Sequence, residues 1–480
     1  MKTNSEPNRS GTLAPESIPT HNTRYVYLIS LVAAMGGLLF GYDWVVIGGA
    51  KPFYETFFHL TRPSQQGWAM SCALVGCLIG ALISGQLSDR FGRKRLLILS
   101  ALLFAVSSLG TGLANDFGGF NGFVMWRITG GMAIGLASTL SPMYIAEISP
   151  AALRGKLVSL NQLNIVVGIL LAQCVNWMIA RPVPAGATAL DIFNSWNGQH
   201  GWRWMFGVTA IPSVLFFLGM LVVPESPRWL AKSGMKEAAR RILAKISGET
   251  GGAQALAEIE LSLKSETGSI GLKSLLGPRL RKILLLGIVL AVLQQWCGIN
   301  VIFNYAQEVF SAAGYNVSNL LLNIVITGAV NLVFTLVAIG LVDKAGRRTL
   351  MLVGSAGLAL IYILLGIGYR TGSQGIPMLL LVVAAIACYA MSLAPVTWVV
   401  ISEIFPNRIR GTAMSIAVAF LWIACFILTY TFPLLNHALG AAETFWIYAG
   451  VCVAGFLFIK SQLPETKGKT LEEIETLWNR

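Results

Sequence analysis

The sequence predicts an all-α polytopic membrane protein with twelve transmembrane helices in two pseudo-symmetric six-helix bundles. Of its 480 residues, 55% are hydrophobic and only 12% are charged, whereas soluble domains carry roughly 25% charged residues. Motifs of the first half also recur in the second half at nearly constant spacing. Much of the basic excess behind the net charge of +13 falls in alternate loops. This pattern indicates membrane orientation and argues against nucleic-acid binding.

Twelve apolar segments approach or exceed the length of about 20 residues that crosses a bilayer as a helix. They lie near residues 25–49, 67–87, 96–115, 122–147, 156–180, 203–223, 282–310, 318–341, 349–369, 377–403, 412–435 and 443–462. Between the sixth and seventh, basic and apolar stretches alternate, which predicts short amphipathic helices on the cytoplasmic surface. The basic loops share one side, so both termini are expected to be cytoplasmic.

The predicted organisation has five parts. The first residues are polar and lack the charged and apolar regions of a signal peptide. They are interpreted as a disordered cytoplasmic tail. The parts are the tail 1–24, an N-terminal bundle 25–223, a cytoplasmic helical linker 224–280, a C-terminal bundle 281–462 and a cytoplasmic tail 463–480.

Two motif pairs relate the halves of the chain. SDRFGRKRLL corresponds to VDKAGRRTLM, and YIAEISPAALRG corresponds to VISEIFPNRIRG. Asp343 follows Asp89 by 254 residues, and Glu403 follows Glu147 by 256 residues. A third pair, PESPRWL and PETKGKT, matches less closely. Such internal repeats predict two similar bundles facing each other, as in many transporters.

Several classes of function find no support. The seven cysteines lie singly in apolar segments without a CxxC or Cys/His pairing, so neither a disulfide framework nor a metal site is expected. The GKT at 468–470 lacks the upstream glycine of a phosphate-binding loop. No enzyme, cofactor or bound metal is predicted.

Asp43 is the only charged residue between Arg24 and Lys51, inside the apolar stretch GGLLFGYDWVVIGGA. An ionised carboxylate at mid-membrane costs at least ~2.5 kcal/mol, so Asp43 requires a partner or a function. Arg127 is similarly alone in the fourth predicted span. An opposite charge favours the ionised carboxylate, whereas burial without a partner favours the protonated one. The two residues are therefore either a switchable proton site or a permanent buried ion pair.

Amide side chains cluster around QQWCGIN, where Gln294, Gln295 and Asn300 lie in the seventh span. On a straight helix Gln294 and Asn300 point about 120° apart. Gly298 lies between them and allows a local unwinding that directs both toward one cavity. Amides and an aromatic face suit a sugar, although hydrogen bonding between helices is the alternative. A further polar stripe on the fifth span consists of Gln162, Gln173 and Asn176.

From Leu31 to Trp478 the sequence resembles the sugar porter family of the major facilitator superfamily. The resemblance is carried by GGLLFGYD, DRFGRK, GLASTLSPMYIAEISP, LRGKLVS, PESPRWL, QQWCGIN, VDKAGRR, WVVISEIFPNRIRGTA and PETKGKTLEEIE. It implies alternating access around one sugar site midway through the membrane. The expected substrate is a monosaccharide, D-xylose or a similar pentose or hexose, imported together with a proton.

The resemblance also implies roles for individual residues. Asp43 and Arg127 would couple the proton, since uniporters of the family tend to carry an uncharged residue at the Asp position. Phe40 is expected to line the sugar cavity. The expected sugar contacts are Gln162, Gln294, Gln295, Asn300, Asn331 and Trp398. The expected cytoplasmic gate, closed in an outward-open state, consists of Asp89, Arg93, Glu147, Arg154, Asp343, Arg347, Glu403 and Arg410.

Three positions depart from the pattern of the family's xylose transporters. Leu421 replaces a polar side chain, and Asn304 replaces the first of two tyrosines, of which Tyr305 remains. Both changes bear on which sugar hydroxyls are recognised. Thr209 stands where those transporters have a second carboxylate, which leaves the strength of proton coupling open.

The leading hypothesis is thus a proton–sugar symporter in a plasma membrane, expected to be a bacterial inner membrane. The expected partners are a monosaccharide, a proton and the lipid bilayer, with no nucleic acid, and the protein is expected to act as a monomer. One alternative is a passive facilitator of the same fold. Another is a nontransporting sugar sensor, which the short predicted tails disfavour.

Overall fold

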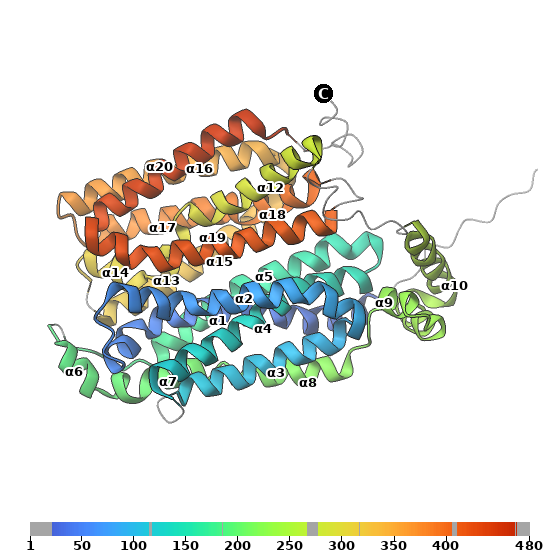
Figure 1. The fold of residues 1–480 in the computed structure, drawn as a ribbon, viewed down its shortest axis with the longest axis horizontal. Coiled ribbons are helices and arrows are strands. Elements are labelled where there is room, and N and C mark those ends of the chain that lie inside the picture. Colours follow the sequence, from blue (N-terminus) through green and yellow to red (C-terminus); the bar gives the residue numbers. More distant parts are fainter. Residues whose placement is uncertain are drawn as a thin grey trace, which may run out of the picture.

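The structure is a computed structural model that describes residues 22–114, 118–184, 186–265, 277–315, 317–405, 410–465 and 467. Every regular element among these residues is a helix. Figure 1 shows the two halves of the chain as two stacked layers of long helices, with α9 and α10 projecting from one end. The predicted all-helical arrangement is confirmed.

The N-terminal half is built from five long helices and a sixth, interrupted span. A short helix, α6 (Ala189–Asn194), precedes that sixth span. The long helices are α1 (Thr23–Phe57), α2 (Pro63–Phe91), α3 (Arg93–Gly112), α4 (Gly119–Ile148) and α5 (Ala151–Ile179). The sixth span comprises a π-helical turn (Asn197–Gly201), α7 (Trp202–Gly207) and α8 (Ala210–Val222).

Two linker helices, α9 (Pro227–Lys232) and α10 (Lys236–Ser265), connect the halves. α10 is kinked at Gly248, where φ is +74°, so it amounts to two short helices, as predicted. The C-terminal half comprises α12 (Pro278–Trp296), α13 (Ile299–Asn304), α14 (Ala306–Ala312), α15 (Val317–Ala345), α16 (Arg347–Arg370), α17 (Ile376–Met391), α18 (Leu393–Ile404), α19 (Arg410–Leu439) and α20 (Ala441–Gln462).

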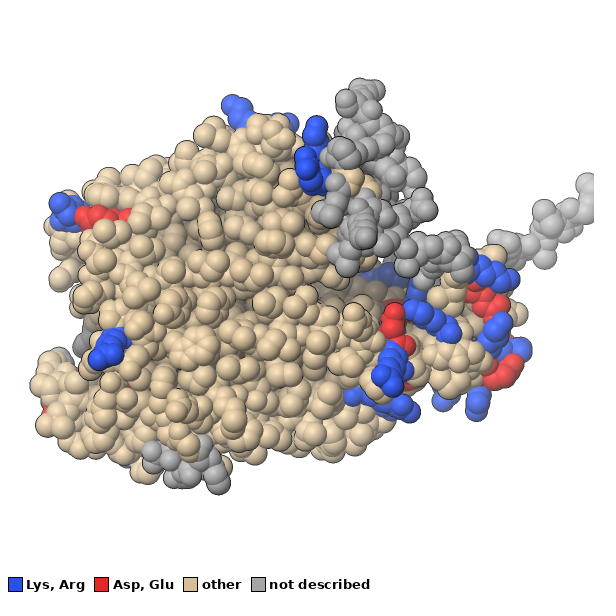
Figure 2. All heavy atoms as spheres, viewed as in Figure 1, with Lys and Arg blue, Asp and Glu red and all other residues tan. Residues whose placement is uncertain are grey.

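The described helices include twelve spans long and apolar enough to cross a membrane. In the view of Figure 2 most charged side chains gather at the end formed by α9 and α10, while uncharged residues cover the middle. A charge-free belt is what a bilayer core requires, because ionised groups are costly there. The chain is therefore a multi-pass membrane protein with the predicted number of spans.

Glycines permit the closest helix crossings in the N-terminal half. A Cβ at Gly131 of α4 would lie 1.8 Å from the carbonyl oxygen of Ala73 in α2. A Cβ at Gly41 of α1 would lie 1.9 Å from the carbonyl oxygen of Ile165 in α5. Small residues let membrane helices approach at backbone distance. The glycines that follow Arg127 on α4, Gly131 and Gly135, thus pack against the backbone of α2.

Two interruptions of spans lie at or near a glycine or a proline. α12 ends before Gly298, whose φ of +84° is left-handed, a conformation that glycine adopts at no steric cost. α17 and α18 meet at Ser392, three residues before Pro395. Proline disfavours helical backbone in the residue before it and cannot donate a helical hydrogen bond. These breaks leave irregular backbone near the middle of the bundle.

The two ends of the bundle differ. The linker end carries α9, α10 and the starts of α3 and α16, and the far end carries α6 and α14 (Figure 1). The halves pack along α2 with α19 and along α5 with α15. Toward the far end α1 meets α13 closely, because a Cβ at Gly48 would lie 2.7 Å from the carbonyl oxygen of Phe303.

Candidate functional site

Asp43 and Arg127 form one buried ion pair inside the N-terminal half. The Arg127 Nη1 donates to Asp43 Oδ1 at 2.8 Å, and Nη2 lies 3.4 Å from the Asp43 carbonyl oxygen. The residues are 4% and 3% exposed. The guanidinium also lies 5.3 Å from the ring centroid of Phe206. The structure thus brings the two predicted residues together from α1 and α4.

This ion pair is only partly satisfied. Asp43 Oδ2 and Arg127 Nε are buried, and neither has a hydrogen-bond partner among the described residues. A carboxylate and a guanidinium can form two parallel hydrogen bonds, but only one joins their side chains here. Gly130, one α4 turn from Arg127, leaves room beside Oδ2: a Cβ there would lie 3.8 Å away. A singly bonded pair is easier to separate than a bidentate one.

A small cavity beside the ion pair reaches the C-terminal half. Its lining includes Arg127 of α4, Trp44 and Ile47 of α1, Met70 of α2 and Asn304 of α13. Asn304 is 5% exposed, and its Oδ1 has no hydrogen-bond partner in the described part of the chain. The ionisable pair of one half is therefore separated from an unpartnered amide oxygen of the other half by a single cavity.

The amides of QQWCGIN form a continuous chain of hydrogen bonds. Asn300 Nδ2 donates to Gln295 Oε1 at 2.5 Å, and Gln295 Nε2 donates to Gln294 Oε1 at 2.7 Å. Gln294 Nε2 then donates to the Tyr389 hydroxyl of α17 at 2.8 Å. All three amide residues are buried. The sequence predicted a break at Gly298, and this break places Asn300 within reach of Gln295.

An aromatic cluster lies across the interface between the halves. Phe40 and Trp44 of α1 and Trp422 of α19 have ring centroids 6.0 Å apart in each pairing. Trp422 Nε1 is buried without a hydrogen-bond partner among the described residues. An indole with a free N–H offers a sugar both an apolar face and a donor.

Trp44 and Trp422 were not among the predicted site residues, although Phe40 was. Trp44 directly follows Asp43, and Trp422 follows the noted Leu421. The sequence held one signal for Trp44, which lies within one helical turn of a carboxylate in a membrane span. Sequence alone does not show that helices so distant along the chain bring their rings together.

The remaining predicted sugar contacts are dispersed over three helices. Asn331 of α15 is buried, Gln162 of α5 is half-buried and Trp398 of α18 is 37% exposed. No described hydrogen bond joins them to the amide chain. Asn176 donates to the Val46 carbonyl oxygen at 2.9 Å and so holds α5 against α1. The observed contact of Asn176 is therefore a hydrogen bond between helices, which was the alternative to sugar binding.

The three departures from the xylose-transporter pattern are all buried. Leu421 is 3% exposed and lies beside Trp422, while Asn304 reaches the cavity next to Arg127. Thr209 is 1% exposed and occupies the joint between α7 and α8. Asp43 has only one ion pair among the described residues, with Arg127.

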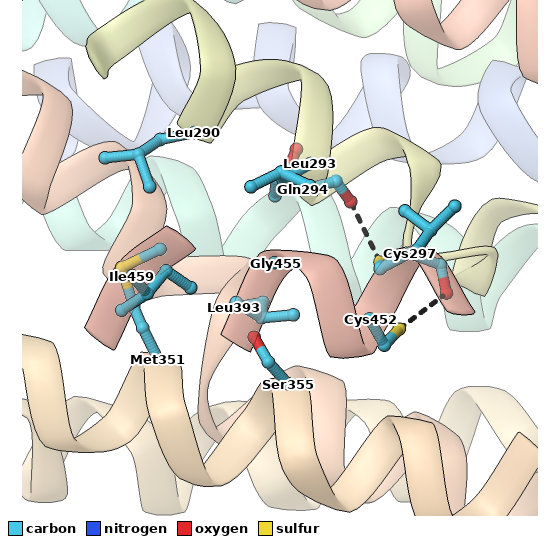
Figure 3. A pocket seen from close by; sticks show the side chains of 11 residues that line it. Leu290, Leu293, Gln294, Cys297, Met351, Ser355, Leu393, Cys452, Gly455 and Ile459 are labelled. Carbon is cyan, nitrogen blue, oxygen red and sulfur yellow. Dashed lines mark hydrogen bonds between the residues drawn. The ribbon is translucent and has the colours of Figure 1, made fainter. Parts of the chain in front are cut away.

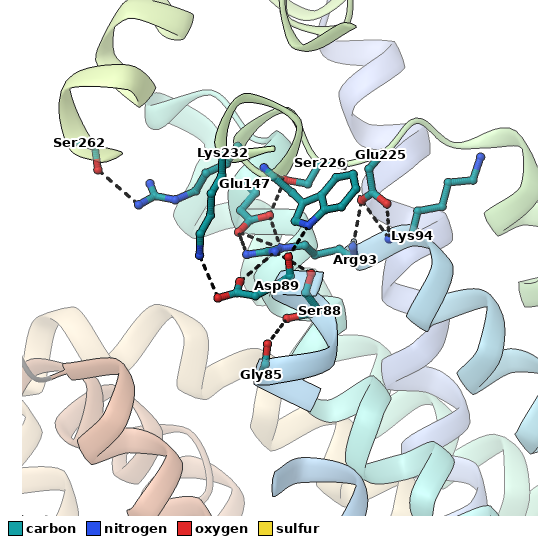
Figure 4. Close-up of polar contacts among 12 residues, drawn as sticks. Gly85, Ser88, Asp89, Arg93, Lys94, Glu147, Glu225, Ser226, Lys232 and Ser262 are labelled. Atoms are coloured by element: carbon teal, nitrogen blue, oxygen red, sulfur yellow. Dashed lines mark hydrogen bonds and ion pairs between the residues drawn. The ribbon is translucent and has the colours of Figure 1, made fainter. Parts of the chain in front are cut away.

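At the linker end of the N-terminal half, ionic contacts converge on Arg93 (Figure 4). Its guanidinium contacts both carboxylate oxygens of Glu147 at 3.0 Å and Asp89 Oδ1 at 3.2 Å. Lys232 of α9 binds the other Asp89 oxygen at 2.9 Å, and the Ser226 hydroxyl donates to Glu147. The linker is thus fastened to the N-terminal bundle.

Arg154 does not pair with Glu147, contrary to the expected grouping. Its Nε donates instead to the Ala146 carbonyl oxygen at 3.1 Å. Arg93 and the Ser226 hydroxyl already occupy the oxygens of Glu147, so the carboxylate is satisfied without Arg154.

The third repeat has the same structural role in both halves. Glu225 of PESPRWL accepts the backbone N–H groups of Arg93 and Lys94 at the start of α3, both at 3.0 Å. Glu465 of PETKGKT accepts those of Arg347 and Arg348 at 3.0 and 3.1 Å at the start of α16. A carboxylate suits a helix N-terminus, where backbone donors are free and the dipole is positive.

The C-terminal counterpart of the Arg93 contact is also present. Arg347 Nη2 lies 3.3 Å from Glu403 Oε1. The side chains of Asp343 and Arg410 lie outside the described part of the structure. The ion pairs Arg93–Asp89, Arg93–Glu147 and Arg347–Glu403 each join residues of one bundle. Lys232–Asp89 binds the linker to the N-terminal bundle, and Lys236–Glu260 lies within the linker.

A separate pocket in the C-terminal half is mainly apolar. Figure 3 shows it between α12, α16 and α20, with Leu290, Met351 and Ile459 among its walls. Cys452 Sγ contacts the Cys297 carbonyl oxygen at its edge at 3.7 Å. Gln294 lines it but directs its amide nitrogen to Tyr389. A polyhydroxylated ligand would find too few polar partners in this pocket.

Known proteins resemble the whole chain in sequence. The arabinose–proton symporter of Bacillus subtilis (strain 168) is 43% identical over 461 residues, covering 96% of this chain and 96% of its own. The D-xylose–proton symporter of Escherichia coli (strain K12), which the sequence motifs also resemble, is 42% identical over 486 residues, covering 95% and 96%.

Solved structures show the same similarity in three dimensions. An inward open conformation of the E. coli xylose transporter XylE superposes with a TM-score of 0.83 at 41% identity, covering 95% of this chain and 100% of that one. XylE bound to 6-bromo-6-deoxy-D-glucose gives a TM-score of 0.79 at 42% identity, with the same coverage. A family model described as sugar (and other) transporter matches residues 29–478, and the chain belongs to that family of transporters, as predicted, and not to a family of enzymes.

Proposed function

We propose that the protein is a proton-coupled monosaccharide symporter that imports a sugar by alternating access. The observation that carries this proposal is the singly bonded Asp43–Arg127 ion pair next to a cavity shared by both halves. The names of the relatives, symporters of arabinose and xylose with protons, support it. We assign the linker end to the cytoplasm, because basic side chains favour that face.

The sugar would bind between the halves. The amide chain of Gln294, Gln295 and Asn300 offers hydrogen-bond donors and acceptors. A sugar hydroxyl can take the place of a neighbouring amide in one of these hydrogen bonds. The unpartnered Trp422 Nε1 and Asn304 Oδ1 are further candidates, since buried polar groups without partners are costly and a ligand relieves that cost. Phe40 and Trp44 would cover the apolar face of the ring. Gln162, Asn331 and Trp398 complete the proposed set.

Proton coupling follows from the two environments of Asp43. While Arg127 is in contact, the carboxylate is stabilised as an anion. When α1 and α4 shift apart, a carboxylate left in an apolar surrounding favours its protonated form. At a membrane potential of −100 mV each entering proton contributes about 2.3 kcal/mol to accumulation. Arg127 would then release the proton by returning to Asp43.

The described state corresponds to a carrier closed at the far end. Contacts between α1 and the α13–α14 segment support this assignment, as does the similarity to an inward open structure. The proposed cytoplasmic gate consists of Asp89, Arg93, Glu147, Arg154, Asp343, Arg347, Glu403 and Arg410. In the outward-open state these residues would exchange some contacts within each half for contacts between the halves.

The test is sugar uptake into proteoliposomes with and without an imposed pH gradient, acidic outside. We expect the gradient to drive accumulation and a protonophore to abolish it. Uptake that ignores the gradient would instead identify a passive facilitator. A panel of xylose, arabinose, fucose and glucose identifies the substrate. Because Leu421 removes a polar contact, we expect a pentose or deoxyhexose to be preferred, and preference for glucose would refute that assignment.

A further inference from the structure

A buried ionic cluster at the far end takes no part in the transport steps above. Lys51 of α1 is 1% exposed. Its ammonium lies 3.0 Å from Glu55 Oε2, one turn later on α1, and contacts Glu308 of α14. It also lies 5.6 Å from the ring centroid of Tyr305. We call Lys51, Glu55 and Glu308 the far-end triad. Since α1 and α14 belong to different halves, the triad ties the halves together.

The triad contains more negative than positive charge. Two carboxylates share one ammonium, and their side chains are only 11% and 23% exposed. Glu55 Oε1 and Glu308 Oε2 are buried without hydrogen-bond partners among the described residues. An uncompensated carboxylate sheltered from water is strongly unfavourable. A proton on one carboxyl group removes the excess charge and leaves a neutral cluster.

The surroundings of the triad add no compensating contact. The titratable side chains next to the triad are Tyr54 on α1, Tyr305 before α14 and Cys72 on α2, and Arg203 of α7 follows beyond Phe57. Phenols and thiols are neutral at pH 7. The Tyr54 hydroxyl donates to the sulfur of Met70, and the Tyr305 hydroxyl donates to the Thr429 carbonyl oxygen. Arg203 stacks on the rings of Phe57 and Trp202 at 5.1 and 5.3 Å.

We propose that the far-end triad is a second proton-binding site, which takes up one proton when the halves close there and releases it when they separate. In the separated state Lys51 keeps Glu55, and Glu308 returns to water as an anion. When the far end closes, the Glu308 carboxylate comes to lie beside the Lys51–Glu55 pair, whose charges already cancel. A hydronium ion then transfers its proton to a carboxylate oxygen, and the same proton leaves on reopening.

Both proton transfers occur on the same side of the membrane. This inference depends on the proposed function in one respect: the far end is taken to face the outside of the cell. External acid would therefore favour the closed far end without changing the number of protons carried with each sugar. It is distinct from the Asp43 site, which lies eight residues earlier on α1, about 12 Å along the helix axis.

The sign and size of the effect follow from linkage. The closed state binds one proton more than the open state, so lowering the pH favours closure. While the carboxyl group titrates, the ratio of closed to open molecules rises by up to about tenfold for each pH unit. Without a bound proton in the triad the ratio is independent of pH.

The test measures the far-end opening directly. Spin labels are attached to cysteines introduced at Gln65, at the start of α2, and Thr371, just after α16, both exposed. Pulsed electron resonance on the full-length protein then gives the distance distribution across the pH range. The measurement is made in an Asp43→Asn background, which removes the other proposed proton site. We expect the short distance to gain population as the pH falls.

Substitutions in the far-end triad test whether the triad binds the proton. Glu308→Gln keeps an oxygen for Lys51 and should leave the far end closed at every pH. Glu55→Gln should do the same, which covers the case in which one variant fails to fold. Lys51→Met leaves two carboxylates to be neutralised, so its far end should open at neutral pH and close more steeply on acidification.

The matched control is Glu443→Gln. Glu443 pairs with Arg370 at 2.6 Å on the same end, but within the C-terminal half. Its loss should leave the pH profile unchanged. Two results would overturn the proposal. One is a closed fraction that does not change with pH when the triad is intact, and the other is a pH dependence that persists in both glutamine variants. Because neither sugar nor a gradient is present, failure of the triad and failure of sugar uptake are observed separately.

Discussion

The two halves of this transporter share a fold but divide the polar groups that they bury at mid-membrane. The N-terminal half holds the ion pair of Asp43 and Arg127 as well as buried amides of its own, Asn161, Gln173 and Asn176. The C-terminal half holds the hydrogen-bonded amide chain of Gln294, Gln295 and Asn300 together with the unpartnered Asn304. Where the repeats are strict, at the starts of α3 and α16, the halves are alike. The halves are thus alike where helices are anchored and differ where ligands are proposed to bind.

The division has a mechanical consequence. If the N-terminal half binds the proton and the amides of the C-terminal half bind the sugar hydroxyls, coupling must cross the interface between the halves. The available route is the cavity lined by Arg127, Trp44 and Asn304, together with the close contact of Gly48 with Phe303. Under the proposed mechanism a change at Asp43 would act on α1, which contacts α13. Variants in either half test this division.

Asp43→Asn should abolish uphill, pH-dependent sugar accumulation while leaving downhill exchange measurable. An amide keeps the shape of the carboxyl group but cannot carry the proton. Uphill accumulation and downhill counterflow of the sugar are measured in the same proteoliposomes and compared. Asp191→Asn, an exposed carboxyl group at the far end, serves as the control and should accumulate sugar normally. Retained accumulation in Asp43→Asn would show that the N-terminal half does not hold the coupling proton.

Gln295→Ala should weaken sugar binding without changing its dependence on pH. It breaks the amide chain at its centre, between Gln294 and Asn300. A buried hydrogen-bond partner left unsatisfied costs about 1–3 kcal/mol, which corresponds to roughly a 5- to 150-fold rise in Kd. Titration calorimetry measures this.

The matched control for Gln295 is Gln66→Ala in the N-terminal half. Gln66 also makes a single amide hydrogen bond, to the Leu60 carbonyl oxygen at 3.0 Å. Its replacement should leave Kd unchanged. Equal losses in both variants would mean that the affinity change reports general destabilisation and not a sugar contact in the C-terminal half.

Glu225→Gln and Glu465→Gln should destabilise the protein by similar amounts, because the two glutamates cap equivalent helices. Each loses a charged acceptor at a helix N-terminus, worth about 1–3 kcal/mol for hydrogen bonds to charged groups. Thermal unfolding in detergent compares the two. The exposed Glu258→Gln should have no effect. A much larger effect in one half would break the equivalence inferred from the PES and PET motifs.

The smallest effect concerns α6, which has no counterpart in the C-terminal half, where Gly440 alone separates α19 from α20. Hydrogen bonds from Thr188 hold the pKa of Asp191 below its ordinary value. This stabilisation is present above the ordinary pKa and is lost as the pH falls through the lowered value. Hydrogen exchange of α6, corrected for the intrinsic rate, should lose protection in acid. Thr188→Ala should remove that pH dependence and leave transport intact.

Much of the fold was predictable because it depends on local composition. Apolar runs of bilayer length mark twelve spans, and the DRFGRK and DKAGRR repeats mark two equivalent halves. Gly298 marked the position of one helix break in advance through its own backbone preference. The boundaries were less accurate: α1 continues to Phe57, beyond the expected end of its span. That extension carries Lys51 and Glu55, whose charges made it look like a loop.

The site was predictable only in part. Asp43, Arg127 and the QQWCGIN amides were identified because polar groups in membrane helices are costly and rarely accidental. Trp44 and Trp422 were missed, because an aromatic residue in a membrane helix carries no such cost. The groups that contact Glu147 could not be identified from the sequence: in this state Arg93 and Ser226 bind the carboxylate, and the proposed gate with Arg154 belongs to the outward-open state.

The sequence by itself determined which segments enter the membrane, where helices break and which residues are too polar to be there without a reason. These properties follow from the transfer free energy and backbone preferences of single residues. Only the tertiary structure decided the partners: Arg127 for Asp43, Gln295 for Asn300, and Glu308 for Lys51 across 257 residues of chain. Partner choice depends on how helices pack in three dimensions, and the pattern along one helix does not specify which neighbour its polar face will meet.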